Sequence, residues 1–142
     1  MSCLICERIS LIEMGTNPLF VKELRTGYVV IGDHQFCRGY TLFLSKVHAT
    51  ELHELTPDFR REFLWDMSQV AEAVYKAFSP DKLNYELLGN TDSHLHWHLF
   101  PRYRSEEHFL RPVWVVPKEV REAVVPTPEE QQELVTALAA YL

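Results

Sequence analysis

The pattern of hydrophobic and polar positions divides the chain into short strands around one long helix. Five segments are rich in β-branched and aromatic residues and predict strands: 20–24, 27–31, 40–45, 83–88 and 94–100. Between the third and fourth of these, apolar residues recur at helical spacing up to about Phe78, behind an N-cap at Thr56 and a proline at the first helical position. Strands flanking one dominant helix are typical of an α+β fold with a largely antiparallel five-stranded sheet.

The two ends of the chain carry further elements. A short helix is expected over 6–13, and the charged stretch after residue 104 is followed by an expected strand at 113–116. A capping box predicts a final helix over 127–141. We therefore expect one domain over 1–104 and a C-terminal extension, 105–142, which adds a strand and a helix to the same domain.

Composition and charge narrow the function classes. The chain has 142 residues, of which 46% are hydrophobic, so one domain with a full core is expected. A net charge of −6 and the lack of a basic block argue against a nucleic-acid binder that neutralises phosphates. With neither a signal-peptide pattern nor an apolar run of roughly 20 residues, the sequence predicts a cytoplasmic protein without a membrane partner.

Three histidines at alternate positions, His94, His96 and His98, are the feature from which chemistry can be argued. On an extended strand they project from one face, and their outer Cα atoms are about 13 Å apart. Two of them could share a tetrahedral metal, but three could not easily do so. Such a row suits a central nucleophile with neighbours that orient it and donate hydrogen bonds to an oxyanion. The alternative is a polar strand face that happens to be histidine.

The chain also begins with a CxxC pair, Cys3 and Cys6. Alone, this pair is ambiguous between zinc, redox chemistry and reduced thiols. No strand is expected before Cys3, which argues against a thioredoxin-like site. Two thiolates with two imidazoles would complete a structural zinc site. The third cysteine, Cys37, is expected to be a small buried hydrophobic residue.

Segment 94–102, His-Leu-His-Trp-His-Leu-Phe-Pro-Arg, resembles the signature of the histidine triad (HIT) superfamily. Three further segments agree in order: Ile-Gly-Asp at 31–33, the strand 39–48 ending in Lys-x-His, and Leu-Leu-Gly-Asn at 87–90. The resemblance covers about residues 3–104.

This resemblance implies a nucleotide hydrolase or transferase that cleaves a nucleoside phosphate ester, a phosphoramidate or a dinucleoside polyphosphate. His96 would take the nucleoside monophosphate as a nucleotidyl-histidine, and water would then release it. His94 and His98 would complete the catalytic set, with His98 hydrogen-bonded to the phosphate oxygens. Asp33 would accept from the ribose hydroxyls, and Ile31 would line the base or sugar pocket. Asn90 would bind near the phosphate or ribose, and Ser93 would supply a further donor. Typical members have a longer glycine-rich loop before the triad, where this chain has only residues 91–93.

The resemblance further implies a structural zinc held by Cys3, Cys6, His48 and His94, with His53 as the substitute for His48. No organic cofactor is expected. Members of the superfamily are usually homodimers, with the long helix and a sheet edge at the interface, so a homodimer is expected here.

Two other functions stay open on the sequence. One is a nucleotide-binding protein that retains the fold without turnover, since a motif does not guarantee catalysis. The other is a zinc-dependent hydrolase that uses the His94/His96 pair directly. The related hexose-1-phosphate uridylyltransferases are disfavoured, because they carry glutamine where this chain has His98.

Overall fold

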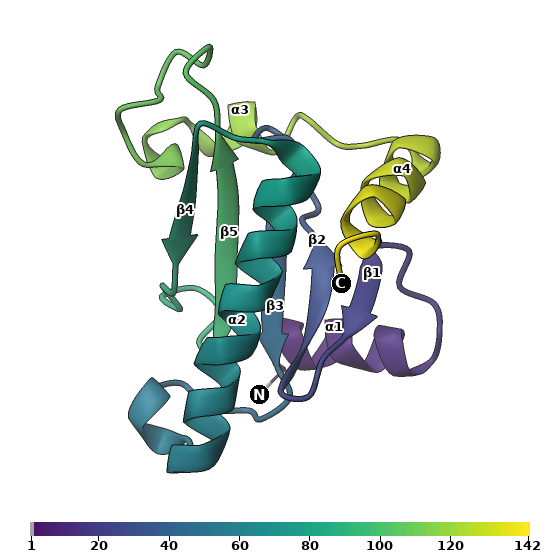
Figure 1. Cartoon of the computed structure of the whole chain (residues 1–142), viewed down its shortest axis with the longest axis vertical. Helices are drawn as coiled ribbons and strands as arrows, with labels where there is room; N and C mark the ends of the chain where they lie inside the picture. Colours follow the sequence, from purple (N-terminus) through teal and green to yellow (C-terminus); the bar gives the residue numbers. More distant parts are fainter. Residues whose placement is uncertain (1) are drawn as a thin grey trace.

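The computed structural model describes residues 2–142, so the first residue of the expected domain lies outside it. Its centre is a five-stranded sheet in the order β1-β2-β3-β5-β4 (Figure 1). The strands are β1 (Phe20–Glu23), β2 (Gly27–Ile31), β3 (Thr41–Ser45), β4 (Lys82–Glu86) and β5 (His96–Arg102). All four neighbouring pairs are antiparallel, which confirms the expected α+β fold.

Within residues 2–142, four α-helices and two 3-10 turns surround the sheet. The helices are α1 (Leu4–Glu13), α2 (Pro57–Phe78), α3 (Lys118–Arg121) and α4 (Pro128–Ala139); the turns are η1 (Leu52–Glu54) and η2 (Val113–Val115). The Thr56 hydroxyl accepts from the Phe59 amide at the start of α2, as the capping pattern predicts.

The prediction of a strand at 113–116 is wrong, because Val113–Val115 forms the 3-10 turn η2. Pro112 and Pro117 flank it. Proline has no amide hydrogen for a sheet ladder, and its fixed φ favours turns at both ends of so short a segment.

The two faces of the sheet pack against different helices. Val29, Phe43 and Leu99 belong to a core shared with α2, which crosses in front of the sheet in Figure 1. Val30 and Leu44 point to the opposite face, where Ile5 of α1 covers them. Alternation along each strand thus separates the core under α2 from a second face under α1.

The histidine strand begins later than expected. β5 starts at His96, two residues after His94, and it pairs with β3 so that His96 faces Leu44 and His98 faces Leu42. Because directly opposed residues share a face, both imidazoles stand on the α1 side of the sheet. Trp97, between them, packs with the α2 core.

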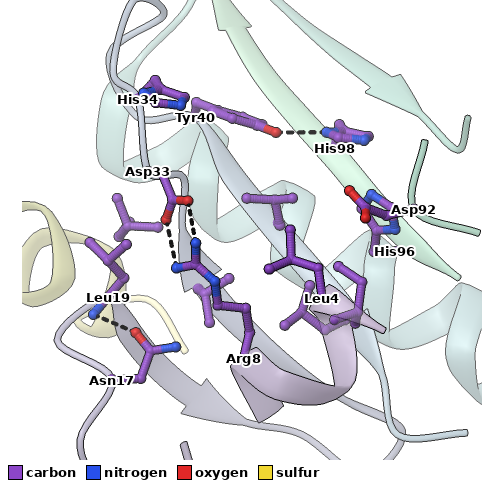
Figure 2. A pocket seen from close by; sticks show the side chains of 15 residues that line it. Leu4, Arg8, Asn17, Leu19, Asp33, His34, Tyr40, Asp92, His96 and His98 are labelled. Carbon is purple, nitrogen blue, oxygen red and sulfur yellow. Dashed lines mark hydrogen bonds and ion pairs between the residues drawn. The ribbon is translucent and has the colours of Figure 1, made fainter. Parts of the chain in front are cut away.

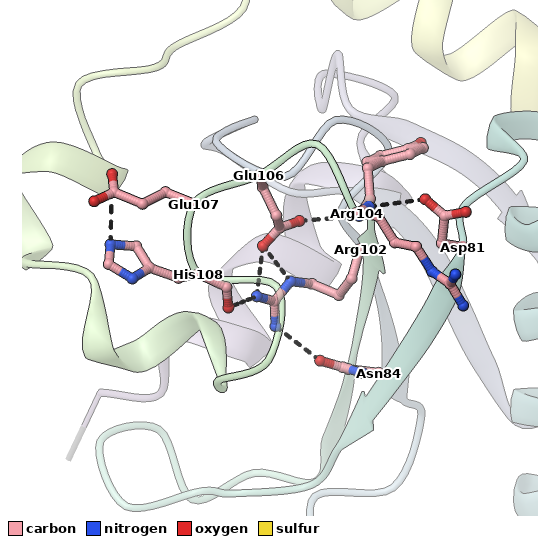
Figure 3. A network of polar contacts seen from close by, with 8 residues as sticks. Asp81, Asn84, Arg102, Arg104, Glu106, Glu107 and His108 are labelled. Carbon is pink, nitrogen blue, oxygen red and sulfur yellow. Dashed lines mark hydrogen bonds and ion pairs between the residues drawn. The ribbon is translucent and has the colours of Figure 1, made fainter.

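The C-terminal extension packs against the sheet and against α2. α4 packs against β1, β2 and α2, with Leu134 and Leu138 buried. Arg102, a residue only 1% exposed, holds the loop after β5. Its guanidinium donates to Glu106, to Asn84 Oδ1 at 2.9 Å and to the His108 carbonyl at 2.8 Å (Figure 3). No helix within residues 2–142 has both the length and the apolar character required to cross a bilayer.

Candidate active site

Two cavities meet at His96 and His98. The first, of about 180 Å³, is a mostly apolar hollow between α1 and strands β2 and β3, with the histidines at one end (Figure 2). The second is a more polar cleft of about 410 Å³ that borders the same two residues. The cleft alone is within the range of small-molecule sites, and the smaller hollow adds to it. A ligand that occupies both would therefore pass directly over the two imidazoles.

His96 has a defined tautomer. Its Nδ1 lies 2.7 Å from the backbone carbonyl oxygen of His94. A carbonyl oxygen can only accept, so Nδ1 carries the hydrogen and Nε2 keeps its lone pair. The ring is thus held with an available nucleophilic nitrogen.

The opposite arrangement holds for His94. Its Nε2 lies 2.7 Å from the Ser45 carbonyl oxygen, so Nε2 donates and the lone pair is on Nδ1. Burial lowers the pKa of His94; the hydrogen bond to the Ser45 backbone opposes this shift, and the neighbouring His48 and His96 add to it. This ring therefore offers Nδ1 to the cysteine pair rather than to the cavities.

The hydrogen-bond partner of His98 is a side chain, that of Tyr40. The Tyr40 hydroxyl lies 2.6 Å from His98 Nδ1 (Figure 2). Burial lowers the pKa of His98 to about 4, with a further contribution from His96, and burial raises the pKa of Tyr40. Both groups are thus neutral near pH 7. Within residues 2–142 the Tyr40 hydroxyl has no hydrogen-bond partner other than His98 Nδ1, so the phenol hydrogen is donated to that lone pair. Nε2 of His98 then carries a hydrogen that it can donate to a ligand.

Asp33 lies at the other end of the first cavity. It forms a bidentate ion pair with Arg8 of α1, at 3.1 and 2.8 Å. A carboxylate has about four lone-pair sites, so its two oxygens can still accept from a diol while the guanidinium fixes their orientation.

The other expected substrate residues are distributed over different walls. Ile31 borders the first cavity, but it is 1% exposed and belongs to the core under α2. Asn90 lines the second cleft. Ser93 lines a third hollow near His53. Of the expected set, the two cavities bring together His96, His98, Asp33, Ile31 and Asn90, whereas Ser93 lies outside both.

The expected metal ligands converge. The Sγ atoms of Cys3 and Cys6 lie 3.5 and 3.4 Å from His94 Nδ1, and Cys6 Sγ lies 3.3 Å from His48 Nδ1. All four ligand atoms lie within 4.8 Å of one another. On a tetrahedral zinc, bonds of 2.0–2.3 Å separate ligand atoms by about 3.3–3.8 Å. The four side chains therefore fit a tetrahedral ion, and the unprotonated Nδ1 of His94 is the atom such an ion needs.

This cluster also bears on two of the sequence-based alternatives. His53, the substitute for His48, is not among the converging ligands. Nor is His96, and its Nδ1 is already bonded to a carbonyl. The ligand set thus gives no support to a zinc hydrolase that uses the His94/His96 pair.

Sequence reasoning missed Tyr40 and Arg8. A signal existed for Tyr40, because positions 40, 42 and 44 alternate on the expected third strand and share the histidine face once β3 and β5 pair. The ion pair of Arg8 with Asp33 left no such signal, since it depends on how α1 docks. The same is true of Trp114 and Arg121, which line the second cleft from the extension.

Comparison with known proteins identifies the family. A family model described as HIT domain matches residues 24–105, more than half of the chain. The chain belongs to the HIT family. Among curated HIT relatives, Protein hit of Bacillus subtilis (strain 168) is 29% identical over 80 residues, which cover 53% of this chain and about half, 55%, of that protein. An adenosine 5′-monophosphoramidase of Schizosaccharomyces pombe is 27% identical over 133 residues, covering 85% of this chain and 92% of the relative.

Solved HIT structures share the fold. A histidine triad protein of Sinorhizobium meliloti 1021 superposes with a TM-score of 0.76 at 22% identity, covering 87% of this chain and 89% of that one. A zinc-bound histidine triad family protein of Mycobacterium smegmatis superposes with a TM-score of 0.66 at 24% identity, covering 99% and 95%. At these identities the likeness concerns the HIT fold alone.

Proposed function

We propose that this HIT protein is a nucleotide hydrolase that cleaves a bond at the α-phosphate of its substrate through a nucleotidyl-histidine on His96. One observation carries the proposal: His96 Nδ1 donates to the His94 carbonyl, which leaves the Nε2 lone pair at the junction of two cavities. The relative named adenosine 5′-monophosphoramidase supports this reaction class.

The reaction has two displacements. In the first, the Nε2 lone pair of His96 forms a bond to the α-phosphorus, and the bond from phosphorus to the leaving group breaks with its electron pair on the leaving group. An amine leaving group takes up a proton from solvent as it departs. In the second, water attacks the phosphorus, the N–P bond breaks, and its electrons return to Nε2 while the water gives up a proton to solvent. Splitting one difficult displacement into two easier ones is the advantage of a covalent nucleophile.

The neighbouring side chains would position and stabilise the phosphoryl group. Nε2–H of His98 would donate to a phosphate oxygen, where charge accumulates in the transition state. The nucleoside would occupy the first cavity, with its ribose hydroxyls donating to Asp33 and with Ile31 on the cavity wall. Asn90 would donate to phosphate or ribose oxygens from the wall of the second cleft, whereas Ser93, which lies outside both cavities, has no part in the proposal.

We propose zinc as the ion at Cys3, Cys6, His48 and His94, with a structural role. Four protein ligands leave no open position for a substrate, which is the mark of a structural site. The ion would supply a fixed link between α1 and the residue that precedes β5. Catalysis would remain with His96.

A homodimer is part of the proposal and rests on the HIT fold. The outer edge of β4 is unpaired within residues 2–142, and Tyr85 on this strand is 49% exposed. Light scattering at micromolar concentration tests this: twice the chain mass is expected, and a monomeric mass would contradict it.

The central experiment is His96→Ala. We expect release of AMP from adenosine 5′-phosphoramidate to fall by at least about a thousandfold, because the attacking atom is removed. In the wild type, rapid quenching followed by mass spectrometry should detect one adenylyl group on the peptide that contains His96.

His108→Ala is the matched control, since it removes a histidine that lines neither cavity, and it should keep wild-type turnover. Undiminished turnover by His96→Ala would exclude the nucleophile. A wild type that binds AMP but turns over no nucleotide would favour the non-catalytic alternative.

A further inference from the structure

The second cleft, beyond His96 and His98, is formed partly by the C-terminal extension. On one side it is bordered by the short loop that carries Asn90 and Asp92, and on the other by residues 114–122 of the extension. The HIT family match ends at residue 105, so the side formed by the extension lies outside the matched residues. The extension thus covers the side of the site where this chain has only three residues between Asn90 and His94.

Trp114 fixes the extension against the catalytic strand. Its indole Nε1–H donates to a carboxylate oxygen of Glu86 on β4. Its ring meets His98 edge-on, with 5.5 Å between centroids and 87° between planes. Since Glu86 pairs with His98 across the β4–β5 ladder, the contact aligns the extension with the triad itself.

Arg121 is the cation of this wall that has no acidic partner. Its guanidinium lies over the Trp114 ring, 4.8 Å from the centroid, and its Nε donates to the Val116 carbonyl at 3.0 Å. Within residues 2–142, no carboxylate lies within ion-pair distance of it. Its terminal amino groups remain to donate to a ligand.

The other charges of the cleft leave Arg121 dominant on that side. Lys118 lies 3.8 Å from Glu122, so these two charges compensate each other, and Glu122 also lies 4.0 Å from His34. Asp92 is on the opposite wall, where the cleft joins the first cavity. A negatively charged group at the outer end would therefore meet Arg121 before it met an unpaired carboxylate.

We propose that this cleft is a leaving-group subsite for phosphate, in which Arg121 binds the phosphate chain of a nucleoside polyphosphate. This inference rests on the proposed function, because a leaving group exists only if His96 attacks the α-phosphorus. The bond between the α-phosphorus and the bridging oxygen breaks, and that oxygen departs with the electron pair as part of a phosphate. Arg121 stabilises this added negative charge, since charge-assisted bonds from guanidinium to phosphate are strong and directional.

The test compares two substrates on the full chain. Diadenosine tetraphosphate has a polyphosphate leaving group, whereas adenosine 5′-phosphoramidate loses only ammonia. For Arg121→Gln, we expect kcat/KM to fall at least tenfold with the tetraphosphate and less than twofold with the phosphoramidate. Arg121→Lys should recover part of the loss, because it restores the charge without the fork of donors.

Arg111→Gln is the matched control, because it removes an exposed arginine of the same extension that does not line the cleft, and neither substrate should be affected. Equal losses of Arg121→Gln on both substrates, no loss on either, or a larger loss on the phosphoramidate would each overturn the subsite. A wild type that hydrolyses only the phosphoramidate would also overturn it and leave the proposed function intact. A wild type that hydrolyses neither substrate would remove both.

Discussion

At the scale of single residues, each histidine of the triad has a different hydrogen-bond partner on one of its two ring nitrogens. His94 donates from Nε2 to a carbonyl and keeps the Nδ1 lone pair for the cysteines. His96 donates from Nδ1 and keeps the Nε2 lone pair for phosphorus. His98 accepts on Nδ1 from Tyr40 and keeps a hydrogen on Nε2. Identical side chains are thus prepared as ligand, nucleophile and donor by their hydrogen-bond partners.

In Tyr40→Phe, the tautomer of His98 should no longer be fixed. Without the phenol hydrogen, Nδ1 of the buried imidazole loses its donor, and the ring can place its own hydrogen on either nitrogen. We expect kcat for the phosphoramidate to fall about five- to thirtyfold, corresponding to about 1–2 kcal/mol for one buried hydrogen bond. Nitrogen-15 NMR of His98 should show the Nε2–H form in the wild type and a mixture in the variant.

Tyr103→Phe serves as the comparison. Its hydroxyl donates to the Phe78 carbonyl at 2.8 Å, away from the triad, so its loss should alter stability without changing the His98 spectrum. An unchanged spectrum in Tyr40→Phe would mean that Tyr40 does not set the tautomer.

The sequence predicts which of these side chains share a face, but it does not predict their tautomers. The alternation of 94–100 is local and survives in β5. The identity of each partner depends on how β3 lies beside β5 and on where Ser45 turns its carbonyl, which are long-range properties. The ion pair of Arg8 with Asp33 cannot be predicted from the sequence for the same reason.

At the scale of elements, α1 joins two functions. Cys3 caps the helix by accepting from the Cys6 amide at 3.4 Å, and both thiols face His94. One turn further along, Arg8 holds the carboxylate at the end of the first cavity. The anchoring of α1 and the shape of that cavity are therefore linked through one short helix.

Loss of the cysteine ligands should loosen this helix. For Cys3→Ser/Cys6→Ser, we expect bound zinc to fall from about one per chain to none. The free energy of unfolding should fall by about 3–4 kcal/mol when zinc exceeds its dissociation constant by roughly 100–1,000-fold. Metal analysis, denaturant unfolding and hydrogen exchange in α1 measure the three effects.

Cys37→Ala is the control, because Cys37 is buried away from the cluster and should leave the metal content unchanged. Wild-type protein that contains no zinc, even after refolding with the metal, would remove the assignment.

The ends of β4 and β5 are joined by one buried arginine. Arg102→Ala removes the donor to the Asn84 amide oxygen and to one oxygen of Glu106, whose other oxygen keeps the Tyr103 amide. Because the Glu106 side chain is 22% exposed, the expected loss is about 3 kcal/mol, at the lower end for a buried pair. Urea unfolding should show this loss, whereas Arg104→Ala, at an exposed position nearby, should stay within about 0.5 kcal/mol. Equal effects of the two substitutions would contradict the role of the network.

Most element boundaries follow from local signals. The N-cap and proline define the start of α2. β-Branched and aromatic residues define five strands to within two residues. The prediction for 113–116 is wrong because the valines of this segment favour a strand, whereas the flanking prolines prevent it from pairing in the sheet. Strand order and the docking of the extension come from packing between distant segments, which a single sequence does not contain.

At the scale of the whole molecule, burial of His98 links stability to pH. Its pKa in the folded protein is about 4, against 6.5 for the unperturbed side chain. The unfolded chain therefore binds more protons between these values, so stability is fully present above pH 6.5 and falls as the pH drops towards 4. Between pH 7 and 4.5 we expect this histidine alone to cost about 2–3 kcal/mol.

Urea titrations of His98→Gln and wild type at several pH values isolate this contribution. The variant should lose less stability on acidification than the wild type. His53→Gln, at an exposed histidine, should follow the wild-type curve. Parallel curves for the wild type and His98→Gln would show that the buried imidazole is not the source.

The partners of the three rings differ in how readily mutation can alter them. Ser45 and His94 contribute backbone oxygens, which any amino acid at those positions would also provide. Tyr40 contributes a side chain, so a single codon change can replace it. If natural selection were to adjust the acidity or reach of this triad while keeping its three histidines, position 40 is where the change would be easiest to make.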